Sequence, residues 1–350
     1  MQEIWIPRIG PPEVLELREA PDPEPGPGEI RVRVQAAGVN FADLLARMGL
    51  YPDAPKLPAV IGYEVAGVVD ALGSGVAEPS PGTPVVCLTR FGGYRSRVVV
   101  PAAQAAVRPA GLDAAHAAAI PVNGLTAWMI LYEMGRLREG DRVLVHSAGG
   151  GVGLAALDLI RARGAVAEGL AGATKHAWLR ERGYAFLADS RREDWDAAFR
   201  GRPPFDLILD ASGGRSWSRS LRLLRPGGRL AVFGFSANAA GRRRSLLRAL
   251  RNLVFGISLR DFHPITLMNR NRGVLGVNLG RLWGEGQRVA GWLGELLGMA
   301  AAGSLRPVVH ARVPFSRAAE AHRILHDREN LGKVVLVPDE ETGDGGESAA

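Results

Sequence analysis

The chain has 350 residues, more than one ordinary domain needs, so two folding units are expected. With 47% hydrophobic and 23% charged residues it can bury a large core, which excludes a disordered or fibrous protein, and its single cysteine, Cys87, excludes a disulfide framework and a thiolate-rich metal site. The formal charge of +7 is carried almost entirely by arginine, because lysine occurs only at Lys56, Lys175 and Lys333.

The N-terminal part of the chain predicts β-structure in a soluble cytoplasmic enzyme. No charged segment precedes an apolar start at Met1, so secretion is not expected. Within the first hundred residues, short runs that alternate or are rich in β-branched residues are separated by Pro- and Gly-rich turns. These runs are Leu15–Leu17, Ile30–Val34, Val65–Val69, Val85–Leu88 and Ser96–Val100.

The longest uncharged stretch, Ala114–Tyr132, is long enough to raise the question of a membrane span. It contains several polar residues and a proline, which a span would have to satisfy in lipid. We therefore interpret it as a helix, a turn at Pro121–Gly124 and a second helix, all buried in a globular core.

From Asn123 onward, strands and helices alternate, which predicts βαβ units and a doubly wound parallel sheet. The fold class is therefore α/β, with a β-rich domain in front of a Rossmann domain. We expect the first domain to span residues 1–121, completed by 305–339, the second to span 122–304, and the tail 340–350 to be disordered. The expected elements are strands Arg142–Ser147, Ala165–Ala171, Asp206–Asp210, Arg229–Gly234, Gly273–Val277 and Lys333–Val337, and helices Leu154–Gly164, Thr174–Gly183 and Gln287–Ala302.

A glycine-rich turn joins the first of these strands to its helix. Such a turn lets the backbone approach a pyrophosphate, and the helix N-terminus offers unpaired N–H groups and a partial positive charge. Its position between a clear strand and a helix makes it more than a plain tight turn. We predict that it binds a dinucleotide through Ala148, Gly149, Gly150, Gly151, Val152 and Gly153.

The end of the second strand decides between NADH and NADPH, because a free 2′-hydroxyl is usually met there by a carboxylate. We place Leu170 at that position, with Glu168 as the acid if the register differs. Lys175 follows at the start of the next helix, and a cation there suits a 2′-phosphate. NADPH is the predicted cofactor.

The segment 242–253 combines an arginine cluster with leucines at helical spacing, which predicts an amphipathic helix. A solvated surface helix is the simplest interpretation, and peripheral contact with a membrane through 242–253 is the alternative. Nucleic-acid binding is not expected, because no basic face with interleaved aromatic residues is present.

Six stretches that span nearly the whole chain carry a resemblance to a known family. They are AAGVNFADLLARMGLYP (Ala36–Pro52), GYEVAGVV (Gly62–Val69), NGLTAW (Asn123–Trp128), VLVHSAGGGVG (Val143–Gly153), GGRLAVFG (Gly227–Gly234) and GKVVLVP (Gly332–Pro338). In this order, they are similar to the medium-chain dehydrogenase/reductase superfamily, and specifically to its zinc-free quinone oxidoreductase branch. Within that branch, the segment Leu267–Glu285 looks most like the vesicle-amine-transport protein homologues.

This resemblance implies a GroES-like fold for the β-rich domain and a mechanism without zinc. Zinc-binding members hold a catalytic metal through a Cys, a His and a further Cys or acid, and a second metal through four cysteines. The matching positions here are Asn40, Tyr63 and a place near Ala118 that offers no ligand. Glu64 remains from the family pattern, but one carboxylate does not hold zinc.

The resemblance also supplies candidate catalytic residues. Asn40 is expected to hydrogen-bond the cofactor ribose or a water near the hydride path, with a helix cap as the alternative. Tyr51 lies where a phenol could donate to the product oxyanion, and Tyr63 is expected to line the pocket. For both tyrosines a packed aromatic is the alternative. A further family tyrosine is replaced by Leu45.

The cofactor residues carried over from the family complete the predicted site. A family tyrosine near the adenosine phosphate is replaced by Ser190, and Arg191 or Arg192 could take over that contact. The other predicted cofactor residues are Thr126 at the nicotinamide ribose, Phe233, Gly234 and Phe235 at the edge of the sheet, and Asn278 and Lys333.

These features predict an NADPH-dependent enzyme that delivers hydride to a quinone or an α,β-unsaturated carbonyl, a small hydrophobic electrophile. The alternative is an NADPH-binding, membrane-associated or regulatory protein with little turnover. A homodimer paired edge to edge through the strand Gly273–Val277 is the expectation from the family.

Overall fold

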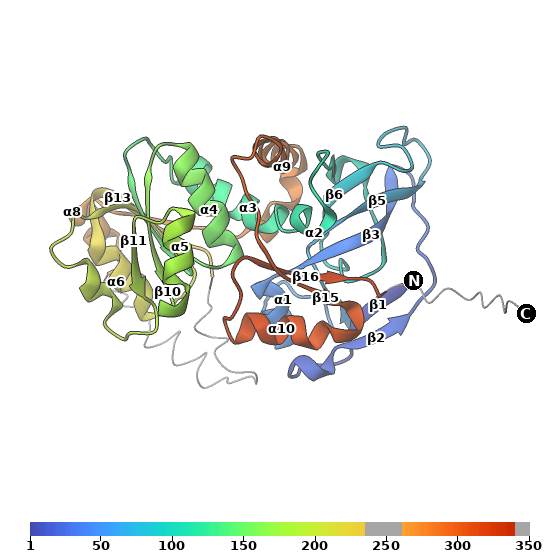
Figure 1. Cartoon of the computed structure of the whole chain (residues 1–350), viewed down its shortest axis with the longest axis horizontal. Helices are drawn as coiled ribbons and strands as arrows, with labels where there is room; N and C mark the ends of the chain where they lie inside the picture. The colour runs from blue at the N-terminus through green and yellow to red at the C-terminus, as the bar shows by residue number, and fades with distance from the viewer. Residues whose placement is uncertain (235–260, 340–350) are drawn as a thin grey trace, which may run out of the picture.

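The computed structural model describes residues 1–234 and 261–339, which form two lobes (Figure 1). Alternation along the strands builds the β-rich lobe. In the long strand β3, Ile30, Val32 and Val34 are buried while the arginines between them point outward. The elements of this part are β1 (Gln2–Ile6), β2 (Glu16–Glu19), β3 (Glu29–Val39), α1 (Phe41–Arg47), β4 (Ala59–Val60), β5 (Glu64–Leu72), β6 (Pro84–Leu88), β7 (Arg97–Pro101) and β8 (Ala105–Val107).

The last described part of the chain returns to this lobe. It contributes β15 (Val309–Pro314), α10 (Ala318–His326) and β16 (Lys333–Val337). The larger sheet has the order β15-β16-β3-β5-β6-β8, with β7 also paired to β3, and a small sheet has the order β2-β1-β4. Because β16 pairs antiparallel with the end of β3, Lys333 is brought next to the start of α1.

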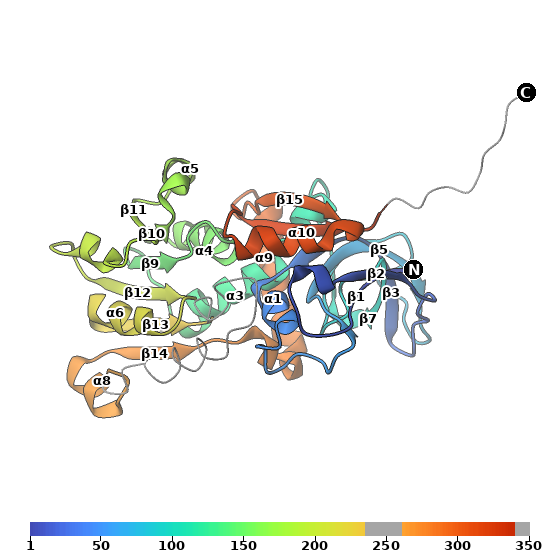
Figure 2. The same cartoon turned by 90° about the horizontal axis from the view of Figure 1, so that it is seen from below.

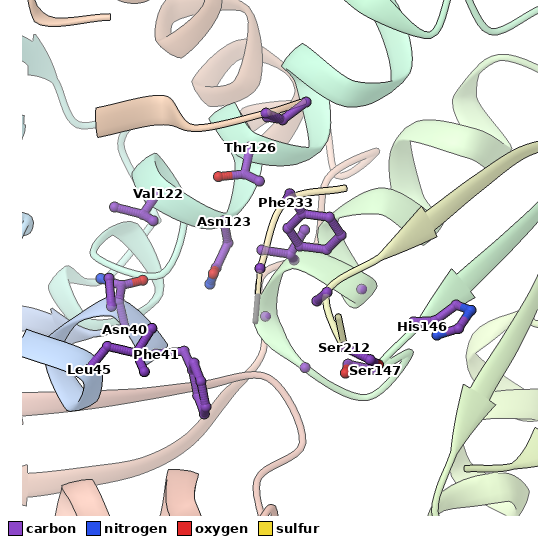
Figure 3. A pocket seen from close by; sticks show the side chains of 18 of the residues that line it. Asn40, Phe41, Leu45, Val122, Asn123, Thr126, His146, Ser147, Ser212 and Phe233 are labelled. Carbon is purple, nitrogen blue, oxygen red and sulfur yellow. The ribbon is translucent and has the colours of Figure 1, made fainter. Parts of the chain in front are cut away.

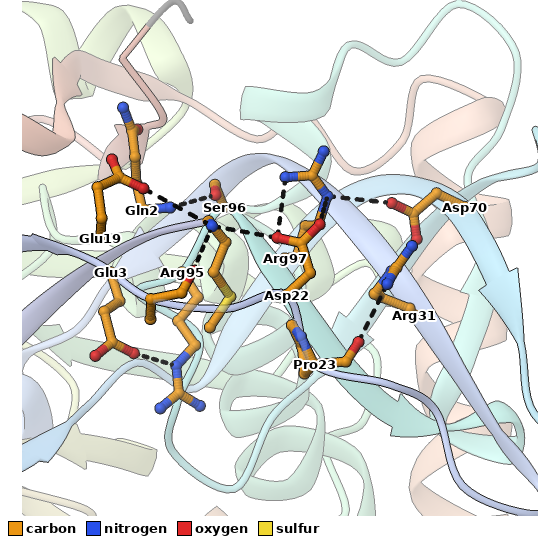
Figure 4. Close-up of polar contacts among 12 residues, drawn as sticks. Gln2, Glu3, Glu19, Asp22, Pro23, Arg31, Asp70, Arg95, Ser96 and Arg97 are labelled. Carbon is orange, nitrogen blue, oxygen red and sulfur yellow. Dashed lines mark hydrogen bonds and ion pairs between the residues drawn. The ribbon is translucent and has the colours of Figure 1, made fainter.

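Polar contacts link the N-terminal segment of this lobe to β7 and link β3 to β5 (Figure 4). Asp22 forms ion pairs with the chain's amino group at 3.2 Å and with Arg97 at 3.2 Å, and Asp70 forms one with Arg31 at 2.8 Å. These partners are partly exposed, so each pair contributes roughly 0–1 kcal/mol. These ion pairs therefore have a structural role, and each stabilises the β-rich lobe only modestly.

The second lobe is a six-stranded sheet in the order β11-β10-β9-β12-β13-β14, with every pair parallel. Both faces are covered: Val143 and Val145 of the central strand β9 enter one hydrophobic cluster, and Leu144 enters another. The elements are β9 (Arg142–His146), α4 (Gly151–Ala162), β10 (Val166–Ala171), α5 (His176–Arg182), β11 (Phe186–Asp189), β12 (Phe205–Asp210), α6 (Arg215–Leu223), β13 (Leu224–Val232), α8 (Pro264–Arg270), β14 (Gly273–Gly276) and α9 (Gly286–Ala301).

The apolar stretch that follows the N-terminal strands lies between the lobes. It forms α2 (Ala114–Ala117), α3 (Pro121–Trp128) and a π-helical turn, Met129–Met134. The predicted turn at Pro121–Gly124 is therefore wrong: the chain bends just before it, because proline favours the first position of a helix. α3 packs against both α4 and α9, in agreement with Figures 1 and 2.

By length and composition alone, Ala114–Met134 would suit a membrane span, with a mean hydropathy of 1.3. In the fold, 67% of its most apolar window is buried inside the protein. Ile120, Leu125 and Ile130 belong to a hydrophobic cluster that also contains residues of both sheets. Packing between the lobes thus accounts for its apolar character, as it does for core helices in general.

The strands and helices expected from the sequence are present, with shifts of a few residues at their ends. The sequence interpretation missed the strands β1, β4, β8, β11 and β15 and the helices α6, α8 and α10. The predicted amphipathic helix 242–253 with its membrane contact, Phe235 and the tail 340–350 lie outside the described residues.

Candidate active site

One cavity of about 2300 Å³ lies where the carboxyl ends of the parallel strands face α1 and β16. A typical pocket for a small ligand has roughly 300–1,000 Å³, so this space is large enough for a cofactor and a substrate together. In Figure 3, Asn40, Phe41 and Leu45 lie on one side of it and His146, Ser147 and Ser212 on the other, with Phe233 between them.

The glycine turn forms one wall of this cavity and opens directly into α4 at Gly151. A Cβ atom on Gly153 would lie 2.6 Å from the carbonyl oxygen of Ser147 and 2.7 Å from that of Ala148, so only glycine allows the helix to start this close to the strand. Gly149, Gly150, Gly151, Val152 and Gly153 all line the cavity. The turn therefore has the shape that a pyrophosphate needs.

Ala148 is the exception among the predicted turn residues. Its side chain is fully buried and it does not line the cavity. Its N–H donates to the carbonyl oxygen of Leu170 at 2.9 Å, which ties β9 to β10. Ala148 thus contributes to the packing between the strands and not to the cavity wall, and its predicted contact with the cofactor stays a prediction.

The end of β10 shows which residue could meet a cofactor ribose. Leu170 and Gly172 line the cavity, whereas Glu168 is buried earlier in the strand, where it pairs with Arg142 and lies 3.4 Å from Arg202. Glu168 is therefore held by arginines away from the cavity, and the register that places Leu170 at the carboxylate position is supported.

Lys175 lies at the cavity wall, but its ammonium already has partners. It donates to the carbonyl oxygens of Arg328 at 2.7 Å and Asn330 at 2.6 Å. Burial, with a smaller contribution from Arg191 and Arg328, lowers its pKa. Next to it, Gly332 donates to the carbonyl oxygen of Gly149 at 2.8 Å. Lys175 thus fastens the loop before β16 to the segment after β10, and Gly332 fastens the same loop to the glycine turn.

The three residues that follow β11 separate into cavity and solvent positions. Ser190 and Arg191 line the cavity, and the guanidinium of Arg191 reaches over Gly172, about 3.5 Å from a Cβ placed there. Within the described part of the chain, no carboxylate forms an ion pair with Arg191. Arg192 instead points to solvent and binds Asp194 at 3.0 Å. Of the two arginines considered from the sequence, only Arg191 faces the cavity.

Asn40 is both the N-cap residue of α1 and a wall of the cavity, so the two alternatives for it are not exclusive. Its backbone N–H donates to Asp43 at 2.8 Å, and its side chain donates to Glu64 at 2.8 Å. Lys333 donates to the Asn40 side-chain oxygen at 2.6 Å and forms an ion pair with Glu64. Asn40, Glu64 and Lys333 form a buried polar cluster that the sequence did not predict.

Tyr51 and Tyr63 lie together at the cavity wall, with ring centroids 6.3 Å apart in an edge-to-face arrangement. Tyr63 also packs against Phe91 at 4.8 Å. Burial raises the pKa of both phenols, so both remain protonated donors at neutral pH. Each tyrosine is therefore a packed aromatic residue that also carries a protonated hydroxyl.

The remaining predicted cofactor residues in the described part of the chain also line the cavity: Thr126, Phe233, Gly234, Asn278 and Lys333. β13 ends at Val232, so Phe233 and Gly234 follow the strand instead of ending it. The side-chain oxygen of Asn278 is occupied by the N–H of Gly280 at 3.0 Å.

Two further groups of lining residues were missed from the sequence. The first follows β12, at the same edge of the sheet as the glycine turn, so the rule that ligands bind at the carboxyl ends of strands could have found it. It comprises Ser212, Gly213, Gly214, Arg215, Ser216 and Trp217. The second is Leu279–Trp283, which lies within the stretch Leu267–Glu285 that carries the resemblance to the vesicle-amine-transport protein homologues but which was given no role in the site.

The donor set of the cavity does not suit a metal ion. In the described ranges, no three His, Cys, Asp or Glu side chains come together in a possible metal site. Glu64, the acid left from the family pattern, is shared by Asn40, Lys333 and the N–H of Val122 at 2.7 Å. A cation would have to displace an ammonium group to reach it.

A parallel sheet that reverses its strand order beside a glycine turn, across a cavity from a β-rich lobe, defines a two-domain protein with a dinucleotide site. Comparison with known families agrees. Residues 26–110 match the alcohol dehydrogenase GroES-like domain, and residues 182–336 match the family described as zinc-binding dehydrogenase. The fold is thus a GroES-like domain joined to a Rossmann domain.

Similar proteins and solved structures show to which branch of these dehydrogenases the chain is most similar. The chain is 38% identical to the synaptic vesicle membrane protein VAT-1 homolog of Rattus norvegicus over 93% of this chain and 80% of that protein. The structure of the human VAT-1 homolog-like protein matches with a TM-score of 0.83 at 30% identity, over 98% of this chain and 99% of that one. The Escherichia coli quinone oxidoreductase complexed with NADPH matches with a TM-score of 0.84 at 30% identity, over 97% and 100%.

The chain therefore belongs to the medium-chain dehydrogenase/reductase superfamily, a family of oxidoreductases, and within it to the zinc-free branch that contains the VAT-1 homologues.

Proposed function

We propose that the protein is a zinc-independent, NADPH-dependent oxidoreductase that reduces a hydrophobic quinone or α,β-unsaturated carbonyl compound. The observation that carries this proposal is the large cavity, which joins the glycine turn to an apolar compartment beside Asn40. The similarity to a quinone oxidoreductase complexed with NADPH supports both the cofactor and the substrate class.

The residues at one end of the cavity would bind the cofactor, and those at the other end would bind the substrate. The glycine turn and the N-terminus of α4 would hold the pyrophosphate, and Arg191 with Lys175 would receive a 2′-phosphate. Bound NADPH would supply the hydride. Thr126 and Phe233 lie where the two lobes meet, in a position to orient the nicotinamide (Figure 3).

The substrate end of the cavity is apolar and aromatic. Phe41, Leu45 and Leu50 come from the β-rich lobe, and Leu282 and Trp283 face them from the Rossmann lobe. The protonated hydroxyls of Tyr51 and Tyr63 provide the few polar groups that orient a carbonyl compound. Without a Lewis acid, an electron-poor acceptor is a better partner for this site than an alcohol.

The activity itself is tested by mixing the full-length protein with NADPH and a panel of quinones and enones, and following the loss of nicotinamide absorbance. Turnover of at least one hydrophobic acceptor, unaffected by a metal chelator, is expected. An enzyme that oxidises alcohols only after zinc is added would contradict the proposal.

Replacement of Arg191 by alanine is expected to weaken NADPH binding roughly 10- to 100-fold, because a charge-assisted contact to the 2′-phosphate is lost. NADH binding, which has no such phosphate, should stay within about twofold. Fluorescence titration with both cofactors measures this difference. Arg192→Ala is the matched control, since that side chain binds Asp194 in solvent. Equal losses for NADPH and NADH would show that Arg191 does not select the phosphate.

We propose a homodimer that pairs through β14. This strand is one of the two outer strands of the parallel sheet, and no described strand covers its free edge. An open edge of this kind is a ready surface for strand pairing. Light scattering is expected to give about twice the mass of the 37.3 kDa chain. A monomer mass would refute the dimer.

A further inference from the structure

The buried polar cluster of Asn40, Glu64 and Lys333 is nearly closed to solvent, with exposed fractions of 6%, 0% and 3%. One oxygen of Glu64 accepts from the amide of Asn40 at 2.8 Å and from the ammonium of Lys333. Lys333 also donates to the amide oxygen of Asn40 at 2.6 Å. Each of the three side chains therefore contacts the other two.

Glu64 is the member of this cluster that lies farthest from the cavity, and its position is fixed. Its second oxygen accepts from the N–H of Val122 at 2.7 Å. A Cβ atom on Gly38 would lie 2.4 Å from the Glu64 carboxylate, so the absence of a side chain at Gly38 makes the room that the carboxylate occupies. Asn40 and Lys333 line the cavity, whereas Glu64 does not. The negatively charged carboxylate of Glu64 thus lies away from the cavity, whereas the donor side chains of Asn40 and Lys333 lie at the cavity wall.

The partners also fix which way the Asn40 amide faces. Its oxygen meets an ammonium and its nitrogen meets a carboxylate, and a flipped amide would lose both contacts. The side-chain nitrogen of Asn40 has two N–H groups, and Glu64 accepts from one of them, so one remains. The ammonium of Lys333 has three N–H groups, and Asn40 and Glu64 accept from two of them, so one remains here too. Among the described residues, nothing accepts either remaining N–H group. Two side chains at the cavity wall therefore keep a spare donor each.

We propose that Asn40 and Lys333 form an oxyanion site that binds the acceptor oxygen of the substrate when it becomes negatively charged. This assignment rests on the function proposed above. When a hydride adds to the β-carbon of an enone, the electron pair of the C=C bond moves and leaves an enolate oxygen with a negative charge. A proton from water then completes the product. A quinone gives a hydroquinone anion in the same way, so both substrate classes need donors at one oxygen.

The cluster suits this charge better than it suits a neutral ligand. Donors fixed in place within a buried site stabilise a developing anion without having to reorganise, and removal of one such donor typically costs roughly 100- to 1,000-fold in kcat. Lys333 is held by Glu64 and cannot turn away, and its remaining N–H group acts together with the free N–H group of Asn40. The cluster also gives Lys333 a catalytic place on the substrate side, different from the cofactor contact expected from the family.

The test uses 4-nitrophenol as a probe, because its phenolate resembles an enolate oxygen and absorbs differently from the phenol. The full-length protein is saturated with NADP⁺ and the probe is titrated at several pH values. In wild type, the apparent pKa of the bound probe is expected to fall by at least about one unit below its value in water, since a donor site favours the anion. In Lys333→Met this shift should disappear, and Lys333→Arg should restore part of it.

Kinetics provide the second readout. Lys333→Met is expected to lower kcat about 100-fold, while the affinity for NADPH from fluorescence titration stays within about threefold. Arg182→Met is the matched control, because it removes a cation from another buried ion pair, with Asp158 at 3.1 Å, and neither residue lines the cavity. The double variant Lys333→Met/Glu64→Gln removes both charges and guards against a folding defect from an unpaired carboxylate.

The outcomes separate the two proposals. A wild-type protein that binds NADPH but binds the probe only as the neutral phenol, or does not bind it, overturns the oxyanion site and leaves the proposed function intact. The same holds if the double variant keeps the full probe shift and kcat. If wild type binds no NADPH at all, the proposed function falls and the oxyanion site falls with it.

Discussion

Replacement of Gly153 by alanine is expected to abolish tight binding of the dinucleotide. The added methyl group would meet two backbone carbonyl oxygens, those of Ser147 and Ala148, at 2.6 and 2.7 Å, and a backbone cannot move aside as a flexible side chain can. The first turn of α4 would have to shift, and its N–H groups would no longer face the pyrophosphate. We expect affinity for NADPH to fall at least about 100-fold, or about 2.7 kcal/mol.

This variant should also lose about 1–3 kcal/mol of stability, as overpacked sites commonly do. Gly291→Ala is the control, because Gly291 lies in α9 and a methyl group added there would have no neighbouring atom within 4 Å. It should bind NADPH as wild type does and gain up to about 1 kcal/mol from helix propensity. Titration and urea denaturation measure both quantities. Normal binding by Gly153→Ala would mean that the turn does not hold the pyrophosphate.

Replacement of Asp43 by asparagine is expected to make stability less sensitive to pH. Asp43 is fully buried on α1, where it accepts from the N–H of Asn40 and, at 3.0 Å, from the hydroxyl of Tyr94. Burial raises the pKa of its carboxyl from 3.8 to about 7. A raised pKa means that the folded protein binds a proton that the unfolded chain has released. The stability from this proton is complete below the unfolded pKa and is lost as the pH rises toward 7.

Wild type should therefore lose stability between pH 5 and pH 8 relative to Asp43→Asn by about 2–3 kcal/mol, since one pKa unit corresponds to about 1.4 kcal/mol. Urea denaturation at several pH values gives the difference. Asp194→Asn is the control: Asp194 is exposed beside Arg192, and its pKa is lowered instead of raised. A constant difference between Asp43→Asn and wild type across this range would show that Asp43 is already ionised in the folded protein.

Most of the fold could be predicted from patterns within short stretches of the sequence. The alternation of β3, the glycine turn before α4 and the alternating strands and helices after Arg142 are features of neighbouring residues, and they predicted the two lobes and the cofactor end of the cavity. Short strands such as β4 and β8 were missed because two or three residues show no period. The bend before Pro121 was misplaced because proline can either end a helix or begin one.

The substrate end of the cavity could not be predicted in this way, because it is built by contacts between residues that are far apart in the sequence. Lys333 and Glu64 are separated by 269 positions, and they meet only because β16 pairs with β3. The sequence offered both residues as isolated carry-overs from a family. Nothing in it indicated that one neutralises the other or that both hold Asn40. The choice between Arg191 and Arg192 likewise depended on which of two adjacent side chains faces the cavity, since both are equally basic.

The late return of β16 to β3 also sets an order for folding during synthesis. A ribosome releases β3, β5 and β6 first, but the partner of Ala37, Gly38 and Val39 is Val334–Leu336, made after the entire parallel sheet. The Rossmann lobe can therefore complete its sheet while the end of β3 in the first lobe is still unpaired on the side of β16. Unpaired strand edges of this kind are prone to misassembly. Lys333 belongs to that last strand, so the cation that pairs with Glu64 is synthesised only when the first domain can also close.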